Sequence, residues 1–144
     1  TIQNRPIRPA LDAGRVAWER VPLDIDAMQS ASQALIGEHD FSAFRTVQCQ
    51  ARSTFRNVRE ITISRLRDEI SIEIEANAFL HHMVRNIVGS LLPIGRGEQR
   101  EAWLGELLAG RDRAKAGPTA PAAGLTFLGP RYPAHWNLPA EVSL

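Results

Sequence analysis

Two runs of alternating residues, 61–64 and 70–76, constrain the fold of this chain more than any other feature of its sequence. In both runs every second residue is apolar, and polar or charged residues stand between them. A period of two is that of a strand with one buried and one solvated face. The polar stretch "RLRDE", residues 65–69, separates the runs. The sequence therefore predicts a β-hairpin with one face on a core, formed by Ile61, Ile63, Ile70, Ile72, Ile74 and Ala76.

Three other segments show the period of helices that bury one face. Residues 22–40 combine this spacing with an acidic first turn, and Gly37 is a suitable stop. After residue 79 the period is helical again, and Pro93 and Gly95 are expected to end or kink that helix. Residues 100–117 predict a further helix with Gly110 as its cap, followed by a short third turn.

The remaining segments are short. The first 22 residues, rich in Pro and Arg, predict an irregular start with one short strand near residues 15–21. The stretch "GLTFLG", residues 124–129, predicts a short apolar strand beside the hairpin. The order helix, strand, strand, helices, strand indicates an α+β fold with an antiparallel or mixed β-sheet and helices packed on one face. We expect residues 1–144 to form a single domain.

The composition sets limits on where such a chain works. Its 144 residues are 44% hydrophobic and 23% charged, a balance that allows one buried core. Apolar runs are too short to span a bilayer and no leader pattern is present, so we expect a soluble protein with no membrane partner. Cys49 is the single cysteine, which excludes an internal disulfide and favours a reducing compartment, the cytoplasm.

The segment "FLHHMVRNIVGS", residues 79–90, places a cation at the margin of an apolar helix. Arg85 falls at the edge of the apolar stripe, with His82 and Gly89 on the same flank. A half-buried guanidinium needs an anion, because an unpaired buried charge costs several kcal/mol. That anion is a carboxylate of this domain or a group from outside it, unless the stem lies across the core with its head in water. Adjacent helical histidines such as His81 and His82 do not chelate one ion, so no metal is expected.

A second region, residues 40–59, interleaves phenylalanines with arginines. This composition is typical of surfaces that stack bases and neutralise phosphates. Phenylalanines that flank a hairpin also belong to cores, and arginines in a loop are often only solvated. All cations except Lys115 are arginines, which a base-composition bias also produces. The residues concerned are Phe41, Phe44, Phe55, Arg45, Arg52, Arg56 and Arg59.

Four separated segments carry a resemblance that covers nearly the whole chain. They are "GEHDFSAFR", "CQARSTFRNV", "ANAFLHHMVRNIVGSLLPIGRG", and "GLTFL" followed by "RYP". Their order and spacing resemble those of the C-terminal half of the bacterial tRNA pseudouridine synthase A (TruA) family. The resemblance implies an enzyme that isomerises uridine to pseudouridine in the anticodon arm of tRNA, without cofactor or metal, and that works as a homodimer. It also implies that the catalytic aspartate lies in an N-terminal domain absent from this chain, so that the chain alone is expected to be inactive.

The same resemblance implies roles for individual residues. Arg85 would pair with the absent aspartate across the cleft between the two halves, which keeps that carboxylate ionised. Leu125 would press on a flipped uracil, and Phe79 and His82 would help to form the pocket. Arg45, Arg52, Arg56 and Arg59 would meet tRNA phosphates. Two other interpretations stay open: an RNA-binding module without catalysis, and a dimerisation domain.

Overall fold

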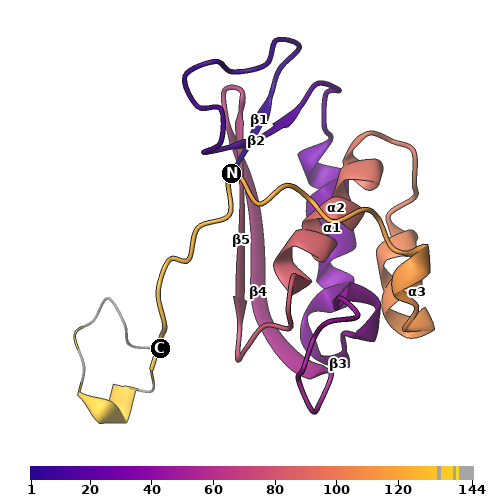
Figure 1. Cartoon of the computed structure of the whole chain (residues 1–144), viewed down its shortest axis with the longest axis vertical. Coiled ribbons are helices and arrows are strands. Elements are labelled where there is room, and N and C mark those ends of the chain that lie inside the picture. Colours follow the sequence, from indigo (N-terminus) through magenta and orange to yellow (C-terminus); the bar gives the residue numbers. More distant parts are fainter. Residues whose placement is uncertain (133, 138, 140–144) are drawn as a thin grey trace.

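A five-stranded mixed sheet forms one layer of the protein, and three helices form the other (Figure 1). The computed structural model describes residues 1–132, 134–137 and 139. The strand order is β2-β1-β5-β4-β3, in which β1 and β2 run parallel and the other neighbours run antiparallel. The strands are β1 (Ile2–Asn4), β2 (Ala17–Glu19), β3 (Gly37–Asp40), β4 (Phe55–Leu66) and β5 (Glu69–Ala76). The predicted α+β class, with helices on one face of a mixed sheet, is confirmed.

The hairpin β4–β5 is the longest pairing in the sheet and confirms the alternating pattern. Leu66 pairs with Glu69, so Arg67 and Asp68 form a two-residue turn, and Arg67 adopts a positive φ of 56° as such turns require. A register shift between Val58 and Glu60 inserts one extra residue into β4. This bulge turns Val58 to the same face as the isoleucines beyond it, so that all of them reach the core.

The first predicted helix exists, but it is shorter than its sequence range. Helix α1 (Ile25–Ser32) begins at Asp24, whose carboxylate accepts hydrogen bonds from two backbone N–H groups of the first turn. A 3-10 turn follows the helix, and Gly37 then adopts a φ of 100°. From that glycine the chain enters β3, a strand that the helical pattern did not predict.

Helices α2 (Met83–Gly95) and α3 (Ala102–Gly110) confirm the two later predictions, with two corrections. Helix α2 ends at Gly95, as predicted, but Pro93 lies inside it and does not end it. A proline at position 93 has no N–H to donate to the carbonyl of Gly89 four residues earlier, and this carbonyl instead faces Gly117. Gly110 is the last residue of α3, while Arg111 takes the left-handed cap position with a φ of 55°. The short third turn is Arg113–Lys115.

The predicted strand at residues 124–129 is wrong. This segment follows a turn and pairs with no strand among the described residues. The sheet position beside β5 is instead taken by β1, which the sequence did not predict. The short strand expected near residues 15–21 is confirmed as β2. Without sheet neighbours, the apolar side chains of Leu125, Phe127 and Leu128 remain more than half exposed.

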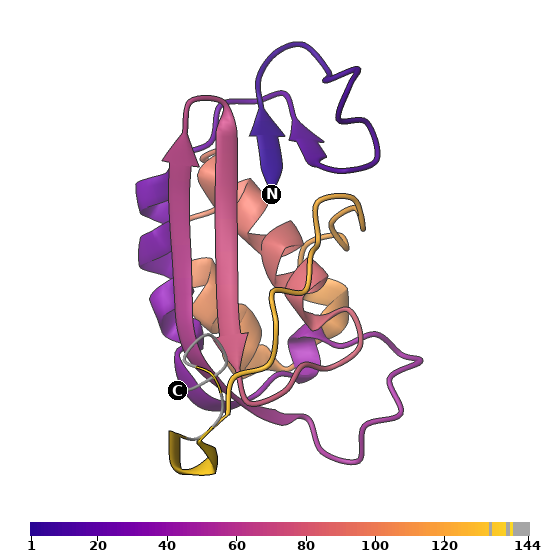
Figure 2. The ribbon, with the colours of Figure 1, turned by 90° about the vertical axis from the view of Figure 1, so that its left-hand side faces the viewer.

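The core lies between the hairpin and the helices, all three of which lie on one side of β4 and β5 (Figure 2). Its largest fully buried members come from every layer: Phe41, Phe44, Met28, Leu35, Ile70, Met83, Ile87, Leu91 and Leu104. No helix in the described part of the chain is both long and apolar enough to cross a membrane.

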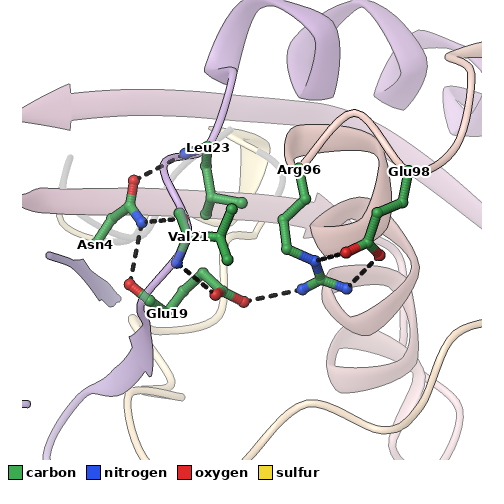
Figure 3. A network of polar contacts seen from close by, with 6 residues as sticks. All are labelled: Asn4, Glu19, Val21, Leu23, Arg96 and Glu98. Atoms are coloured by element: carbon green, nitrogen blue, oxygen red, sulfur yellow. Dashed lines mark hydrogen bonds and ion pairs between the residues drawn. The ribbon is translucent and has the colours of Figure 1, made fainter. Parts of the chain in front are cut away.

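Asn4 joins the first strand to the segment that leads into α1 (Figure 3). Its buried side-chain amide donates to the carbonyls of Glu19 and Val21 at 3.1 and 2.6 Å and accepts from the N–H of Leu23 at 3.0 Å. A buried amide that satisfies three backbone groups fixes an irregular segment as firmly as a strand would.

An ion-pair chain continues from there to the end of α2 (Figure 3). The carboxylate of Glu19 lies 2.9 Å from Arg96, which also pairs with Glu98 at 2.8 Å. The hydrogen bonds that Arg96 donates to Glu98 and Glu19 raise the pKa of Arg96, and the bond to Glu98 lowers the pKa of that carboxyl group. The N-terminal segment is thereby fastened to the helix layer.

Candidate active site

The sharp start of α2 decides where its polar side chains lie. Leu80 and Met83 are buried and close a turn in which the N–H of Met83 donates to the carbonyl of Leu80 at 3.0 Å. Between them, His82 adopts a left-handed conformation with a φ of 60°. Such a conformation is uncommon outside glycine, and here it reverses the chain within two residues. This turn therefore places His81 and His82 at the N-terminal end of α2.

Arg85 lies half-buried one turn into α2 and makes two polar contacts. Its Nε donates to the carbonyl of Ala120 at 2.7 Å, and its Nη1 lies 3.2 Å from Nε2 of His82. The N–H of Ala120 returns a hydrogen bond to the carbonyl of Arg85 at 3.1 Å. No carboxylate forms an ion pair with Arg85 among the residues that the structure describes. Within that part of the chain, its Nη2 group has no hydrogen-bond partner.

The two histidines form a stacked pair beside this arginine. Their ring centroids are 3.9 Å apart with an interplanar angle of 25°, and Nδ1 of His81 lies 2.8 Å from the hydroxyl of Thr46. Burial, and then the neighbouring charges of His81 and Arg85, lower the pKa of His82. A neutral His82 can accept a hydrogen bond from Arg85 through Nε2, whereas a protonated ring could not. Neutral His82 therefore helps to hold the guanidinium of Arg85 in position.

The segment 116–120 lies directly against α2. A Cβ atom at Gly89 would lie 1.7 Å from the carbonyl oxygen of Pro118, and one at Gly117 would lie 2.2 Å from the carbonyl oxygen of Gly89. The hydroxyl of Ser90 accepts a hydrogen bond from the N–H of Gly117 at 3.0 Å. Backbone can approach backbone this closely only where both residues lack a side chain. This close contact places Ala120 next to Arg85.

A buried polar network holds the same segment from the other side. The side chain of Asn86 is fully buried; it donates to the carbonyl of Phe44 at 2.7 Å and accepts from Thr119 at 2.7 Å and from Arg113 at 3.0 Å. Arg113 also donates to the carbonyl of Gly117 at 2.9 Å. Every polar atom of the Asn86 side chain thus has a partner. Sequence reasoning missed these residues, although a lone asparagine within the apolar period of α2 was the available signal.

Leu125 and Phe79, the two apolar residues expected at this site, are both partly exposed at the protein surface. Leu125 is 53% exposed and Phe79 is 40% exposed. Leu125 closes a turn by donating its N–H to the carbonyl of Ala122 at 3.1 Å. The preceding Gly124, at a φ of 86°, accepts a hydrogen bond from the amino group of Thr1 at 2.8 Å. The structure therefore brings Arg85 and His82 into contact. Leu125 is linked to Arg85 only along the chain, through Ala120, which Arg85 contacts.

The fold places the interleaved phenylalanines and arginines of residues 40–59 in different environments. Phe41 and Phe44 are fully buried, as the core interpretation predicts, whereas Phe55 is half exposed. Arg56 donates to the carbonyl of Ser53 at 3.0 Å, and Arg59 pairs with Glu75 at 3.3 Å. Arg45 and Arg52 have no ion-pair partner in the described part of the chain.

No cluster of three or more His, Cys, Asp or Glu side chains able to hold a metal ion occurs among residues 1–132, 134–137 and 139. Cys49 is free, and hydrogen bonds from the backbone of Ala51 and His81 lower its pKa. It lies in the loop before β4, half-buried, beside the arginines of that loop.

Comparison with known proteins identifies one class of protein. Residues 31–133, which run from the end of α1 past α3 and include Arg85, match the family model of tRNA pseudouridine synthase. Two relatives narrow the class. The chain is 61% identical over 142 residues to the tRNA pseudouridine synthase A of Xanthomonas campestris pv. campestris (strain B100), which covers 99% of this chain and 55% of the relative. It is 59% identical over 143 residues to the tRNA pseudouridine synthase A of Stenotrophomonas maltophilia (strain K279a), with 99% and 56% covered. The chain belongs to the tRNA pseudouridine synthase A family, and it spans about half the length of these relatives.

Proposed function

We propose that this chain is the C-terminal half of a cytoplasmic tRNA pseudouridine synthase that isomerises uridine in the anticodon arm of tRNA without cofactor or metal. The observation that carries the proposal is Arg85, a half-buried guanidinium with no carboxylate partner among the described residues. The chain covers 55% of relatives named tRNA pseudouridine synthase A, so another half is available to supply that carboxylate. In this proposal the carboxylate is the catalytic aspartate.

The geometry of Arg85 suits this role. Its Nε is held by Ala120 and its Nη1 by His82, so the plane of the guanidinium is oriented before any partner arrives. The unpaired Nη2 remains to donate to a carboxylate oxygen. A guanidinium at hydrogen-bond distance lowers the pKa of a carboxyl group and keeps it ionised. An ionised, fixed carboxylate is the form that can act on the ribose or the base of a flipped uridine.

The apolar residues at the margin then bind the base. During the isomerisation the bond from N1 of uracil to the ribose breaks and a bond from C5 to the ribose forms, while the hydrogen on C5 leaves as a proton and N1 takes up a proton. The detached uracil must be retained and turned within its pocket. Exposed apolar side chains such as Leu125 and Phe79 offer faces against which a base can pack. His82 contributes by holding Arg85.

The arginines of the loop supply charge for the RNA backbone. Arg45 and Arg52, without ion-pair partners in the described chain, are the first candidates for phosphate contact. Arg56 and Arg59 are already engaged in part, with Ser53 and Glu75. Each phosphate contact releases bound counterions, so binding of tRNA should weaken steeply with added salt.

The full-length enzyme is proposed to act as a homodimer. Light scattering measures its molar mass in solution and so tests this proposal.

Tritium release tests the proposed function. Unmodified tRNA that carries tritium on C5 of its uridines loses the label to water when pseudouridine forms. The full-length protein should release it, and the 144-residue chain alone should not exceed the blank, because the aspartate lies in the other half. Turnover by the isolated chain, or none by the full-length protein, contradicts the proposal.

A further inference from the structure

The loop between β3 and β4, residues 41–54, is attached to α2 and to the turn that precedes this helix. The buried side-chain amide of Asn86 donates to the carbonyl of Phe44 at 2.7 Å. Two residues further along the loop, the N–H of Thr46 donates to the carbonyl of His81 at 3.4 Å. The loop that carries the candidate RNA-binding arginines is therefore fixed directly to the start of α2.

A chain of side-chain contacts continues from this loop to Arg85. The hydroxyl oxygen of Thr46 lies 2.8 Å from Nδ1 of His81. The ring of His81 stacks on the ring of His82, with centroids 3.9 Å apart and an interplanar angle of 25°. Nε2 of His82 in turn lies 3.2 Å from Nη1 of Arg85. Three successive contacts thus connect the loop with the guanidinium.

The last contact of this chain decides the tautomer of His82. A guanidinium carries only donors, so Nε2 of His82 accepts and the proton of the neutral ring lies on Nδ1. In the part of the chain that the structure describes, Arg85 is the one hydrogen-bond partner of this ring. The rotation of the His82 ring is therefore restrained mainly by its stack on His81.

The ring of His81 depends on Thr46 in the same way. His81 is exposed, and the hydroxyl of Thr46 is the one hydrogen-bond partner of its ring among the described residues. An exposed side chain without a partner moves among several rotamers. Loss of the hydroxyl should therefore release the ring of His81, and with it the support of His82.

We propose that Thr46 and His81 are positioning residues for Arg85, and that they link the orientation of its guanidinium to the loop that contacts the RNA backbone. Arg45 immediately precedes Thr46, so a phosphate bound by Arg45 also holds the residue that restrains His81. Neither Thr46 nor His81 contacts the substrate in this proposal, because both act through His82. The inference deepens the proposed function and rests on it for the reaction that the link serves.

Steady-state kinetics of the full-length protein separates positioning from binding. Thr46→Val keeps the size of the side chain and removes the hydroxyl. The kcat for pseudouridine formation should fall by roughly fivefold with KM unchanged, because the contact acts on the guanidinium and not on the affinity for tRNA. Thr46→Ser, which keeps the hydroxyl, should restore kcat to within about twofold. A raised KM with an unchanged kcat in Thr46→Val would make Thr46 an RNA-binding residue and overturns the proposal.

The matched control is Thr62→Val on β4. The hydroxyl of Thr62 is exposed and donates to the carboxylate of Glu60 at 3.2 Å, so the substitution removes one surface hydrogen bond away from Arg85. Both kcat and KM should stay unchanged in this variant. An equal loss of kcat in Thr62→Val and Thr46→Val contradicts a specific role of Thr46.

A double-mutant cycle tests whether the effect passes through His82. His82→Asn removes the ring and keeps a residue type that tolerates the left-handed backbone at this position. In that background Thr46→Val should lower kcat by less than about twofold, because the link is already broken. Effects of the two substitutions that simply multiply would show that Thr46 acts by another route, and would overturn the proposal.

NMR of the 144-residue chain tests the link without catalysis. The order parameter of the Nε–H bond of Arg85, which donates to Ala120, should fall in Thr46→Val and in His82→Asn, and should not change in Thr62→Val. At about pH 8, where the ring is neutral, the nitrogen shifts of His82 should report a proton on Nδ1. An unchanged order parameter of Arg85 in Thr46→Val overturns the proposal.

Failure of the link and failure of the proposed function give different results. If the unsubstituted full-length protein releases no tritium while Arg85 loosens in the Thr46→Val chain, the proposed function is wrong and the link is present. If tritium release is normal and Thr46→Val changes neither kcat nor the order parameter, the proposed function stands and the link is wrong.

Discussion

Asn86 and Arg85 are neighbours in α2, yet they belong to regions of opposite character. Around Asn86 the polar groups form a closed network, in which the side chain satisfies the carbonyl of Phe44 and the donors of Thr119 and Arg113. At Arg85 the network is open, because part of the guanidinium has no partner in the described chain. Both regions hold the segment 116–120. The closed network therefore holds the fold together, whereas the guanidinium of Arg85 keeps a donor group, Nη2, without a partner among the described residues.

The largest expected effect comes from closing the space between α2 and that segment. Gly89→Ala would place a Cβ 1.7 Å from the carbonyl of Pro118, so the segment must move and the network must break. We expect the free energy of unfolding to fall by about 3 kcal/mol. Urea denaturation followed by circular dichroism measures it. Gly110→Ala, where no atom lies within 4 Å, is the matched control and should be neutral or stabilising by up to about 1 kcal/mol.

Removal of the amide at the centre of the closed network should have the next largest effect. Asn86→Ala leaves the carbonyl of Phe44 and the guanidinium of Arg113 without their buried partner. The expected loss is about 2 to 3 kcal/mol of unfolding free energy, since unsatisfied buried groups are costly. Asn77→Ala, which removes one exposed hydrogen bond to the N–H of Asn57, should cost about 1 kcal/mol or less. Similar losses for both variants would refute the closed-network interpretation.

The open region should behave differently in the same assay. Arg85→Lys removes the hydrogen bond from Nε to Ala120 but leaves the buried network intact. We expect the free energy of unfolding of the 144-residue chain to fall by only about 1 kcal/mol. A loss as large as that of Asn86→Ala would show that Arg85 is chiefly a structural residue.

The smallest expected effect is a pH dependence from His82. Its pKa is lowered in the folded chain, so the folded state favours the neutral ring. The free energy of unfolding that this difference contributes is fully present above the pKa of His82 in the unfolded chain, about 6.5. It is lost as the pH falls through the lower pKa of the folded chain. Unfolding measured between about pH 7.5 and about pH 5.5 should show this decline in the wild-type chain. His82→Gln should flatten it, and an unchanged slope in that variant would assign the decline to other groups.

The sequence predicted the elements whose side-chain period is long enough to be distinctive. The hairpin, α2 and α3 have apolar residues that repeat over two or more turns or pairs, because each buries one face. Strands β1 and β3, of three and four residues, were not predicted, because their positions depend on backbone pairing with distant residues. Strand β2 is equally short, but its local sequence indicated it. The segment 124–129 has a strand composition, but it forms no strand without a neighbour.

The candidate site was likewise predicted only in part from the sequence. The position of Arg85 at a helix margin followed from helical geometry, and the structure places it half-buried there. Its contacts with Ala120 and the network around Asn86 join residues 27 to 42 positions apart, which no local period encodes. The assignment of Arg85, Leu125, Phe79 and His82 to substrate or aspartate stays a prediction.

The rate of pseudouridine formation by the full-length enzyme with Arg85→Lys is the most direct test of the open region. Lysine keeps the charge but not the planar fork that holds Ala120 and His82 and still presents Nη2. We predict a rate lower by roughly 100-fold than that of the unsubstituted enzyme, with a similar unfolding midpoint. Equal rates for the two proteins would contradict the proposed pairing of Arg85 with a carboxylate of the other half.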